Sequence, residues 1–192
     1  MFQLYIYSFL ATFLFTPFGI FFFKRNEKDL EYFSYQLIFG IIFISFIALL
    51  LNFFFPLDQL INSLLIVLSA YIIIKNRKVY LTKNYFFYSI ISAFIIFLLI
   101  KESNVYRPDA GLYHLPFINI LHHEKIVLGL SNLHFRFGHI SIIQYLNAIN
   151  YNFINGLNGI LIPLASLMVF IFLYFVNEIY NFLKKKENFN LN

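Results

Sequence analysis

Cysteine is absent from this chain of 192 residues, and charged residues make up only 12% of it. The missing cysteine excludes disulfides, iron–sulfur clusters, zinc–thiolate sites and thiol nucleophiles. The low charge, together with 60% hydrophobic residues, excludes a disordered chain, because such chains are polar. A soluble core of this size also has no room for so much apolar surface, since accessible surface grows nearly as fast as mass. Part of the protein surface must therefore face lipid.

Long apolar runs alternate with short polar turns. We expect five of them to form membrane-spanning helices, at about 2–23, 33–57, 59–74, 84–100 and 159–177. The first would span about 33 Å, enough for a hydrocarbon core of about 30 Å. Residues 1–100 then hold four spans and 101–158 a long loop, while 159–192 hold the fifth span and a tail, with Lys184 to Lys186 ending that span. The predicted fold class is all-α, a polytopic transmembrane helical bundle with an extracytoplasmic loop of short amphipathic helices.

The basic residues lie in alternate loops. They follow the first, third and fifth predicted spans: Lys24, Arg25, Lys28, Lys75, Arg77, Lys78, Lys83 and Lys184 to Lys186. The positive-inside rule places these loops in the cytoplasm. The N-terminus is then outside, the C-terminus is cytoplasmic, and the loop 101–158 is extracytoplasmic. The net charge of +5 is thus explained by orientation in a lipid bilayer, and we expect no nucleic-acid partner.

The loop 101–158 differs in character from the spans, because it holds all five histidines, four of the glycines and two of the prolines. Pro108 and Gly111 flank Asp109, which we expect to cap a helix. Apolar residues then recur at helical spacing, which predicts an amphipathic helix on the membrane surface, kinked or divided by Pro116. A second set, Ile140, Ile143, Tyr145 and Leu146, predicts another short helix that returns toward the membrane.

Two blocks in this loop resemble a known family. The first is Asp109-x-x-x-Tyr113-His-Leu-Pro, and the second is Gly129-Leu-x-Asn-Leu-His-x-Arg136. Together they resemble a bacterial, surface-polysaccharide branch of the polytopic GT-C glycosyltransferases, over roughly 107–148. The resemblance implies transfer of a sugar from a polyprenyl-phosphate donor to a cell-envelope glycan or lipid acceptor, in the bacterial inner membrane. GT-C enzymes usually have eight or more spans, so we expect this chain to be an N-terminal portion of one.

The residues of the two blocks suit that chemistry. A phosphate leaving group is stable as an anion, so one carboxylate, Asp109, suffices as the base for the acceptor hydroxyl. His114 is the second candidate catalytic residue, because histidine can assist proton transfer near neutral pH. Cations would stabilise the phosphate, and arginine does so with two hydrogen bonds. The expected substrate-binding residues are Arg107, Tyr113, Lys125, Asn132, His134 and Arg136.

Simpler interpretations exist for several of these side chains. Asp109 can serve only as a helix cap, and His134 and Arg136 can anchor the chain at the interface. His122 and His123 with Glu124 look like half a metal site. Adjacent helical residues point about 100° apart, so we predict a hydrated face and no metal site there.

Two other functions remain open at this stage. One is a non-enzymatic polytopic membrane protein, such as a transporter subunit or an assembly partner, and the other is a non-functional truncation product. Transporters place ionisable groups within their spans, whereas the predicted spans here contain almost none. Asn52 and Asn62 are their main polar side chains besides serine and threonine. This distribution favours chemistry at the membrane surface over transport.

Overall fold

A computed structural model of the chain describes residues 2–22, 30–101, 110–138, 141–151 and 156–190. Five long helices fall at the predicted apolar runs: α1 (Phe2–Gly19), α2 (Leu30–Asn52), α3 (Gln59–Lys75), α5 (Lys83–Lys101) and α9 (Ile162–Asn190). The shorter elements are α4 (Arg77–Tyr80), a π-helical turn (Ala110–His114), α6 (Leu115–His123), α7 (Leu130–Leu133), a 3-10 turn (Phe135–Gly138), α8 (Ile142–Asn150) and a second 3-10 turn (Gly156–Ile160). These described parts contain no strand, so the all-α prediction is confirmed for them.

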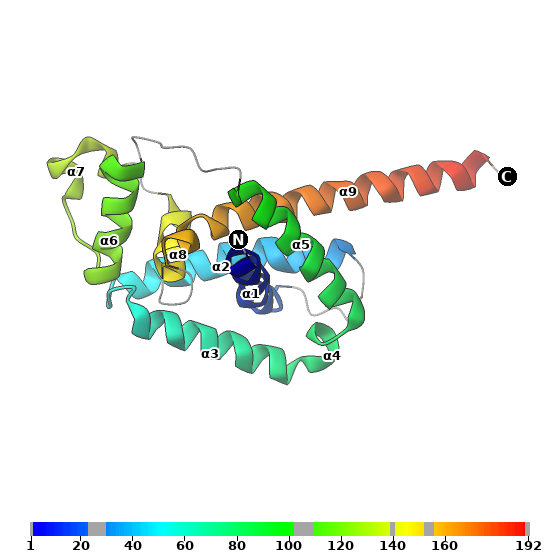
Figure 1. Cartoon of the computed structure of the whole chain (residues 1–192), viewed down its shortest axis with the longest axis horizontal. Helices are drawn as coiled ribbons and strands as arrows, with labels where there is room; N and C mark the ends of the chain where they lie inside the picture. Colours follow the sequence, from blue (N-terminus) through cyan, green and yellow to red (C-terminus); the bar gives the residue numbers. More distant parts are fainter. Residues whose placement is uncertain (1, 23–29, 102–109, 139–140, 152–155, 191–192) are drawn as a thin grey trace.

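Three of the described helices are long and apolar enough to cross a membrane: Leu30–Asn52, Lys83–Lys101 and Ile162–Lys184. They indicate a membrane protein. Helix α3 has 17 residues, about 26 Å at the usual rise, which is less than a hydrocarbon core of about 30 Å. Helix α1 is seen nearly end-on in Figure 1, while α2, α3 and α9 lie in the plane of the picture. The prediction of five spans therefore stays a prediction for α1 and α3.

The last candidate membrane span ends at Lys184, where the sequence analysis expects the lysines to end it, but the helix itself is longer. Helix α9 passes through Lys184 to Lys186 and continues to Asn190. Lysine is a good helix former, so it ends an apolar run without ending the hydrogen-bonded helix. Pro163 stands in the first turn of α9, where its missing N–H has no intrahelical partner to lose.

Helices α1 and α2 pack closely at two glycines. A Cβ on Gly19 would lie 2.0 Å from the carbonyl oxygen of Gln36, and one on Gly40 would lie 2.0 Å from that of Phe15. No other residue type allows this approach of two backbones. Around this contact the interior is apolar, with the fully buried side chains Phe15, Phe18, Leu37, Ile41, Ile44, Ile96 and Phe170. Helix α3 joins α1 through the Ser69 hydroxyl, which donates to the Phe13 carbonyl at 2.8 Å.

The short helices gather at one end of the bundle. Figure 1 shows α6, α7 and α8 beside the end of α2 and the start of α3, while α4 and the far end of α9 lie at the opposite side. Backbone hydrogen bonds hold this arrangement, from Leu57 N–H to the Leu121 carbonyl and from Ile126 N–H to the Asn52 carbonyl, both at 2.8 Å. The buried Asn52 amide adds a bond to the Glu124 carbonyl at 3.1 Å. The segment after α6 is therefore fixed to the end of α2.

Candidate functional site

The first part of the candidate site is the π-helical turn Ala110–His114, which carries Tyr113 and His114 and leads directly into α6. Pro116 lies in the first turn of α6, a position that proline tolerates because the N–H it lacks would be unpaired there. Of the two expectations for Pro116, a kink or a division of the helix, the structure shows a change from a π-helical turn to an α-helix that begins at Leu115. This change leaves Tyr113 and His114 immediately before α6.

The second part is a tight reversal after α6. Gly129 precedes α7 with φ 82°, a left-handed conformation that glycine adopts at no steric cost. Helix α7 has only 4 residues, and the 3-10 turn Phe135–Gly138 follows it after His134. This compact path returns the chain toward the π-helical turn and brings Arg136 back to Tyr113.

Four predicted site residues meet there, and we call Tyr113, His114, His134 and Arg136 the Tyr113 cluster. The guanidinium carbon of Arg136 lies 4.9 Å from the centroid of the Tyr113 ring. The rings of Tyr113 and His134 are nearly parallel, with centroids 6.5 Å apart and an interplanar angle of 14°. The ring of His114, the next residue along the chain, has its centroid 4.2 Å from that of Tyr113. Residues from both sequence blocks therefore share one small surface.

Gln144 is a member of this neighbourhood that the sequence analysis missed. Its side-chain nitrogen lies 3.0 Å from Nδ1 of His114. Gln144 also completes a capping box at the start of α8, where its side-chain oxygen accepts from the Ser141 N–H at 3.2 Å. The signal that would have found its capping role is the pattern Ser141-x-x-Gln144 before an apolar run. No local sequence pattern predicts the contact of Gln144 with His114, because His114 lies 30 positions earlier.

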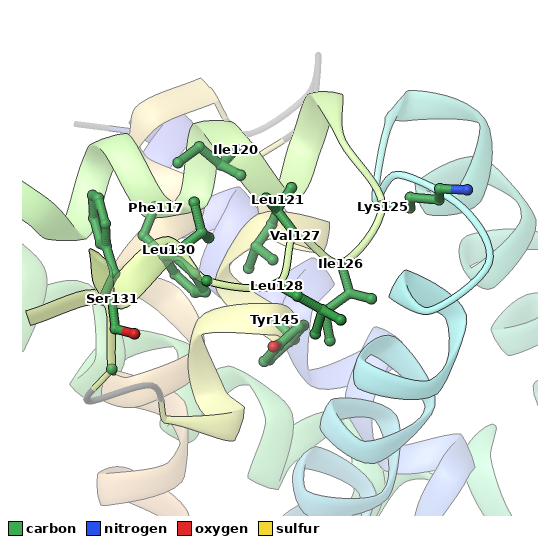
Figure 2. Close-up of a pocket in the computed structure, with 13 residues that line it drawn as sticks. Phe117, Ile120, Leu121, Lys125, Ile126, Val127, Leu128, Leu130, Ser131 and Tyr145 are labelled. Carbon is green, nitrogen blue, oxygen red and sulfur yellow. The ribbon is translucent and has the colours of Figure 1, made fainter. Parts of the chain in front are cut away.

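An apolar pocket of about 240 Å³ adjoins the Tyr113 cluster. Its lining comes from α6, the segment after it, α7, the 3-10 turn Phe135–Gly138 and α8. Figure 2 labels Phe117, Leu121, Val127, Leu128 and Tyr145 among these residues, and Phe137 also lines the pocket. Phe137 connects the two features, because its ring lies 5.7 Å from that of His134 and 6.1 Å from that of Phe117. Burial raises the pKa of the Tyr145 phenol, which therefore stays protonated at neutral pH.

The remaining predicted residues lie elsewhere. Lys125 stands at an edge of the pocket, and its amino group points away from the apolar side chains in Figure 2. Asn132 is exposed on α7, beside Gly129. Within the described residues neither makes a hydrogen bond or ring contact with the Tyr113 cluster. Arg107 and Asp109 lie outside the described residues, and so does His139.

The two adjacent histidines of α6 form a different environment. The rings of His122 and His123 are perpendicular, with centroids 5.3 Å apart, and the His122 ring also lies 5.4 Å from that of Tyr151. Burial lowers the pKa of His122, and the neighbouring His123 lowers it further. Among the described residues there is no group of three or more histidine, aspartate or glutamate side chains that could hold a metal ion.

Comparison with known proteins gives a family but no activity. No curated protein matches the chain, and no solved structure matches it. The family model described as a domain of unknown function, DUF8201, matches residues 1–192. The match spans the whole sequence, from α1 to the last residue. The chain therefore belongs to the DUF8201 family.

Proposed function

We propose that this chain is all or part of a membrane glycosyltransferase of GT-C type, which transfers a sugar from a polyprenyl-phosphate donor to a cell-envelope glycan. One observation carries the proposal. Two blocks separated by about twenty residues, Tyr113-His114 and His134-x-Arg136, come together in the fold, with Arg136 4.9 Å from the Tyr113 ring. A purely interfacial role for these side chains would not require them to meet.

Arg136 suits the phosphate of such a donor. Stacking on Tyr113 uses the face of the guanidinium, whereas phosphate recognition uses its edge, so the two contacts are compatible. The centroid of the Phe135 ring also lies 5.7 Å from the guanidinium carbon. A cation–π contact at a partly exposed site contributes only about 0.5–1 kcal/mol. Its value here is orientation, because a held guanidinium loses less freedom when a ligand binds.

The apolar pocket suits the other end of the donor. A polyprenyl phosphate joins an anionic head to an apolar tail, and the Tyr113 cluster and the pocket share Phe137 as a common wall. The ligand class that fits both features together is an amphiphile with an anionic head. A soluble sugar nucleotide would leave the pocket lining without a partner.

The base in this proposal is Asp109, which lies outside the described residues but immediately before the turn that carries Tyr113. Asp109 takes the proton of the acceptor hydroxyl while the oxygen of that hydroxyl forms the new bond to the sugar's anomeric carbon. The bond from that carbon to the phosphate oxygen breaks, and the polyprenyl phosphate leaves as an anion. Because the phosphate leaves as a stable anion, the reaction requires no general acid.

A transporter subunit is the less favoured alternative. Among the described residues the buried polar side chains are serine, threonine, asparagine and glutamine, and none is charged. Ionisable groups that face the interior are the usual mark of a transport pathway. The described interior therefore resembles a scaffold more than a pathway.

We further propose that all five long helices lie in the membrane, in the orientation that the basic loops favour. Lys75, Arg77, Lys78 and Lys83 lie around α4, at the end of the bundle away from the Tyr113 cluster. The cluster is then extracytoplasmic. In this cysteine-free chain, Asn132→Cys should react with an impermeant thiol reagent in intact cells, and Asn76→Cys should not. The reverse labelling would contradict the orientation.

The test of function is binding of a polyprenyl phosphate and of the matching polyprenol to the purified chain in detergent, measured by native mass spectrometry. The wild type should prefer the phosphate. Arg136→Gln should reduce phosphate binding by about 10- to 100-fold, the value of one charged hydrogen-bonding group, and leave polyprenol binding unchanged. Arg136→Lys keeps the charge but not the planar guanidinium with its two parallel donors. Its affinity for the phosphate should therefore lie between those of the wild type and Arg136→Gln. Equal binding of phosphate and alcohol to the wild type would contradict the proposal.

A further inference from the structure

The two histidines of the Tyr113 cluster share an unusual feature, because each accepts a hydrogen bond at Nδ1. In a neutral imidazole one ring nitrogen carries the proton and donates, and the other accepts. At His134 the partner is the backbone N–H of Arg136, 3.3 Å from Nδ1. A backbone N–H can only donate, so Nδ1 of His134 accepts and the ring proton is on Nε2.

At His114 the same conclusion follows through Gln144. The side-chain oxygen of Gln144 is occupied by the Ser141 N–H, which can only donate. This bond fixes which way the amide faces, and the amide nitrogen is therefore the atom 3.0 Å from Nδ1 of His114. An amide nitrogen donates and does not accept. Nδ1 of His114 thus accepts, and its ring proton is also on Nε2.

We propose that Gln144 is a positioning residue, which together with the Arg136 backbone holds His114 and His134 as Nε2–H donors for a phosphate. The rings then add two neutral donors to the charged donors of Arg136, and such a set favours a ligand rich in acceptor oxygens. The identity of that ligand as the polyprenyl phosphate rests on the proposed function, whereas the tautomers do not. His114 in this state presents a donor and not a base at Nε2, which leaves the base role to a carboxylate.

The choice of glutamine at position 144 is informative. The third position of a capping box takes glutamate as readily as glutamine, since either supplies an oxygen for the cap backbone N–H. Only glutamine can at the same time donate to His114. Gln144 is itself 7% exposed, whereas His114 is exposed and the contact between them is partly buried. The cap alone therefore does not explain the residue, and the contact with His114 does.

Three variants separate the two roles of Gln144. Gln144→Glu keeps an oxygen for the Ser141 N–H but reverses the bond to His114, because a carboxylate accepts. Gln144→Leu removes both bonds. Ser141→Ala removes the hydroxyl that caps α8 yet keeps the backbone N–H that orients Gln144, and so it is the structural control.

The experiment is nitrogen-15 NMR of the histidine side chains in the full chain in detergent, with His114 assigned from the spectrum of His114→Gln. In the wild type, Nδ1 of His114 should be unprotonated and Nε2 protonated. Ser141→Ala should leave this pattern, Gln144→Leu should give mixed tautomers, and Gln144→Glu should protonate Nδ1. A wild-type His114 with its proton on Nδ1 would overturn the proposal without any variant.

Binding of a polyprenyl phosphate tests whether the tautomer of His114 matters for ligand recognition. Gln144→Glu should weaken it by about tenfold or more, the value of one hydrogen bond to a charged group, while Ser141→Ala should not. Unchanged binding in Gln144→Glu, with the tautomer reversed, would remove the histidine from phosphate recognition. If the wild type binds no polyprenyl phosphate but shows the expected tautomer, the proposed function fails and the assignment of Gln144 stands.

Discussion

The long helices and the segment from the π-helical turn to α8 differ in how they use polar side chains, although Ser69 of α3 and Asn52 of α2 also bond to other elements. In the helices the hydroxyls of Ser8, Ser45 and Ser92 each bond to the carbonyl four residues earlier in their own helix. In the other segment polar groups join distant parts of the chain, as His114 and Gln144 do across 30 residues. Polar groups that satisfy themselves support a scaffold in lipid. Polar groups held by distant partners create a surface with defined chemistry.

The largest expected effect concerns the base. Asp109→Asn should cost well under 1 kcal/mol of stability, since asparagine caps a helix about as well as aspartate. An amide cannot take a proton, so sugar transfer should fall by roughly 10²- to 10⁴-fold. The measurement is transfer from a polyprenyl-phosphate sugar, at matched expression, in an active protein that contains this segment.

Asp109→Ala is the comparison variant for that experiment. If Asp109 is only a cap, alanine should destabilise the protein by about 1 kcal/mol while asparagine is silent in both stability and transfer. Full activity in Asp109→Asn would therefore remove the carboxylate from the reaction.

The next effect lies in the scaffold. Gly40→Ala would place a Cβ 2.0 Å from the Phe15 carbonyl oxygen and force α1 and α2 apart. We expect a loss of about 1–3 kcal/mol, the usual cost of overpacking, measured by thermal unfolding in detergent. Gly111→Ala is the matched control, because a Cβ there meets nothing within 4 Å. An unchanged melting temperature for Gly40→Ala would contradict the close approach of the two helices.

A third variant breaks the connection between the two regions. The fully buried Asn52 donates to the carbonyls of Glu124 and Phe55 at 3.1 and 3.3 Å. Asn52→Ala leaves both without this partner, at a cost of about 1–3 kcal/mol. We expect faster amide hydrogen exchange over 121–130 and little change within α5. Exposed Asn132→Ala should change neither, and equal exchange in both variants would show that Asn52 does not hold this segment.

The fold was more predictable from the sequence than the site was. Apolar runs located all five long helices. The role of Asp58, which caps α3 by accepting from the N–H groups of Leu60 and Ile61, was not predicted. The lysines located the end of the last apolar span at Lys184 but not the end of α9, because hydropathy reports the apolar run and not the helix. The meeting of Tyr113 with Arg136 depends on the reversal at Gly129, a tertiary event. Asn132 shares a sequence block with the cluster but not its position, and Lys125 lies between the blocks at an edge of the pocket, since spacing along the chain does not fix direction in a loop.

The smallest expected effect is a pH dependence of folding stability that arises from His122, at the end of α6. Burial lowers the pKa of His122 in the folded protein below its ordinary value of 6.5. The unfolded chain then binds the proton more readily, so stability should decline as the pH falls from about 6.5 through the lowered pKa. His122→Gln should remove most of that decline between pH 7.5 and 5, and His123→Gln, which only relieves the smaller repulsion from a neighbouring exposed ring, should remove less of it. Identical slopes for the two variants would contradict the assignment to His122.

The most direct test of the central claim is to locate a bound lipid. A polyprenyl phosphate with a photoreactive group in its first isoprene unit should crosslink to the pocket residues between 117 and 145 in the purified protein. Polyprenyl phosphate should compete, polyprenol should not, and Arg136→Gln should lose the crosslink. Adducts spread along the lipid-facing sides of α2, α5 and α9, insensitive to the phosphate, would contradict a binding site at the Tyr113 cluster.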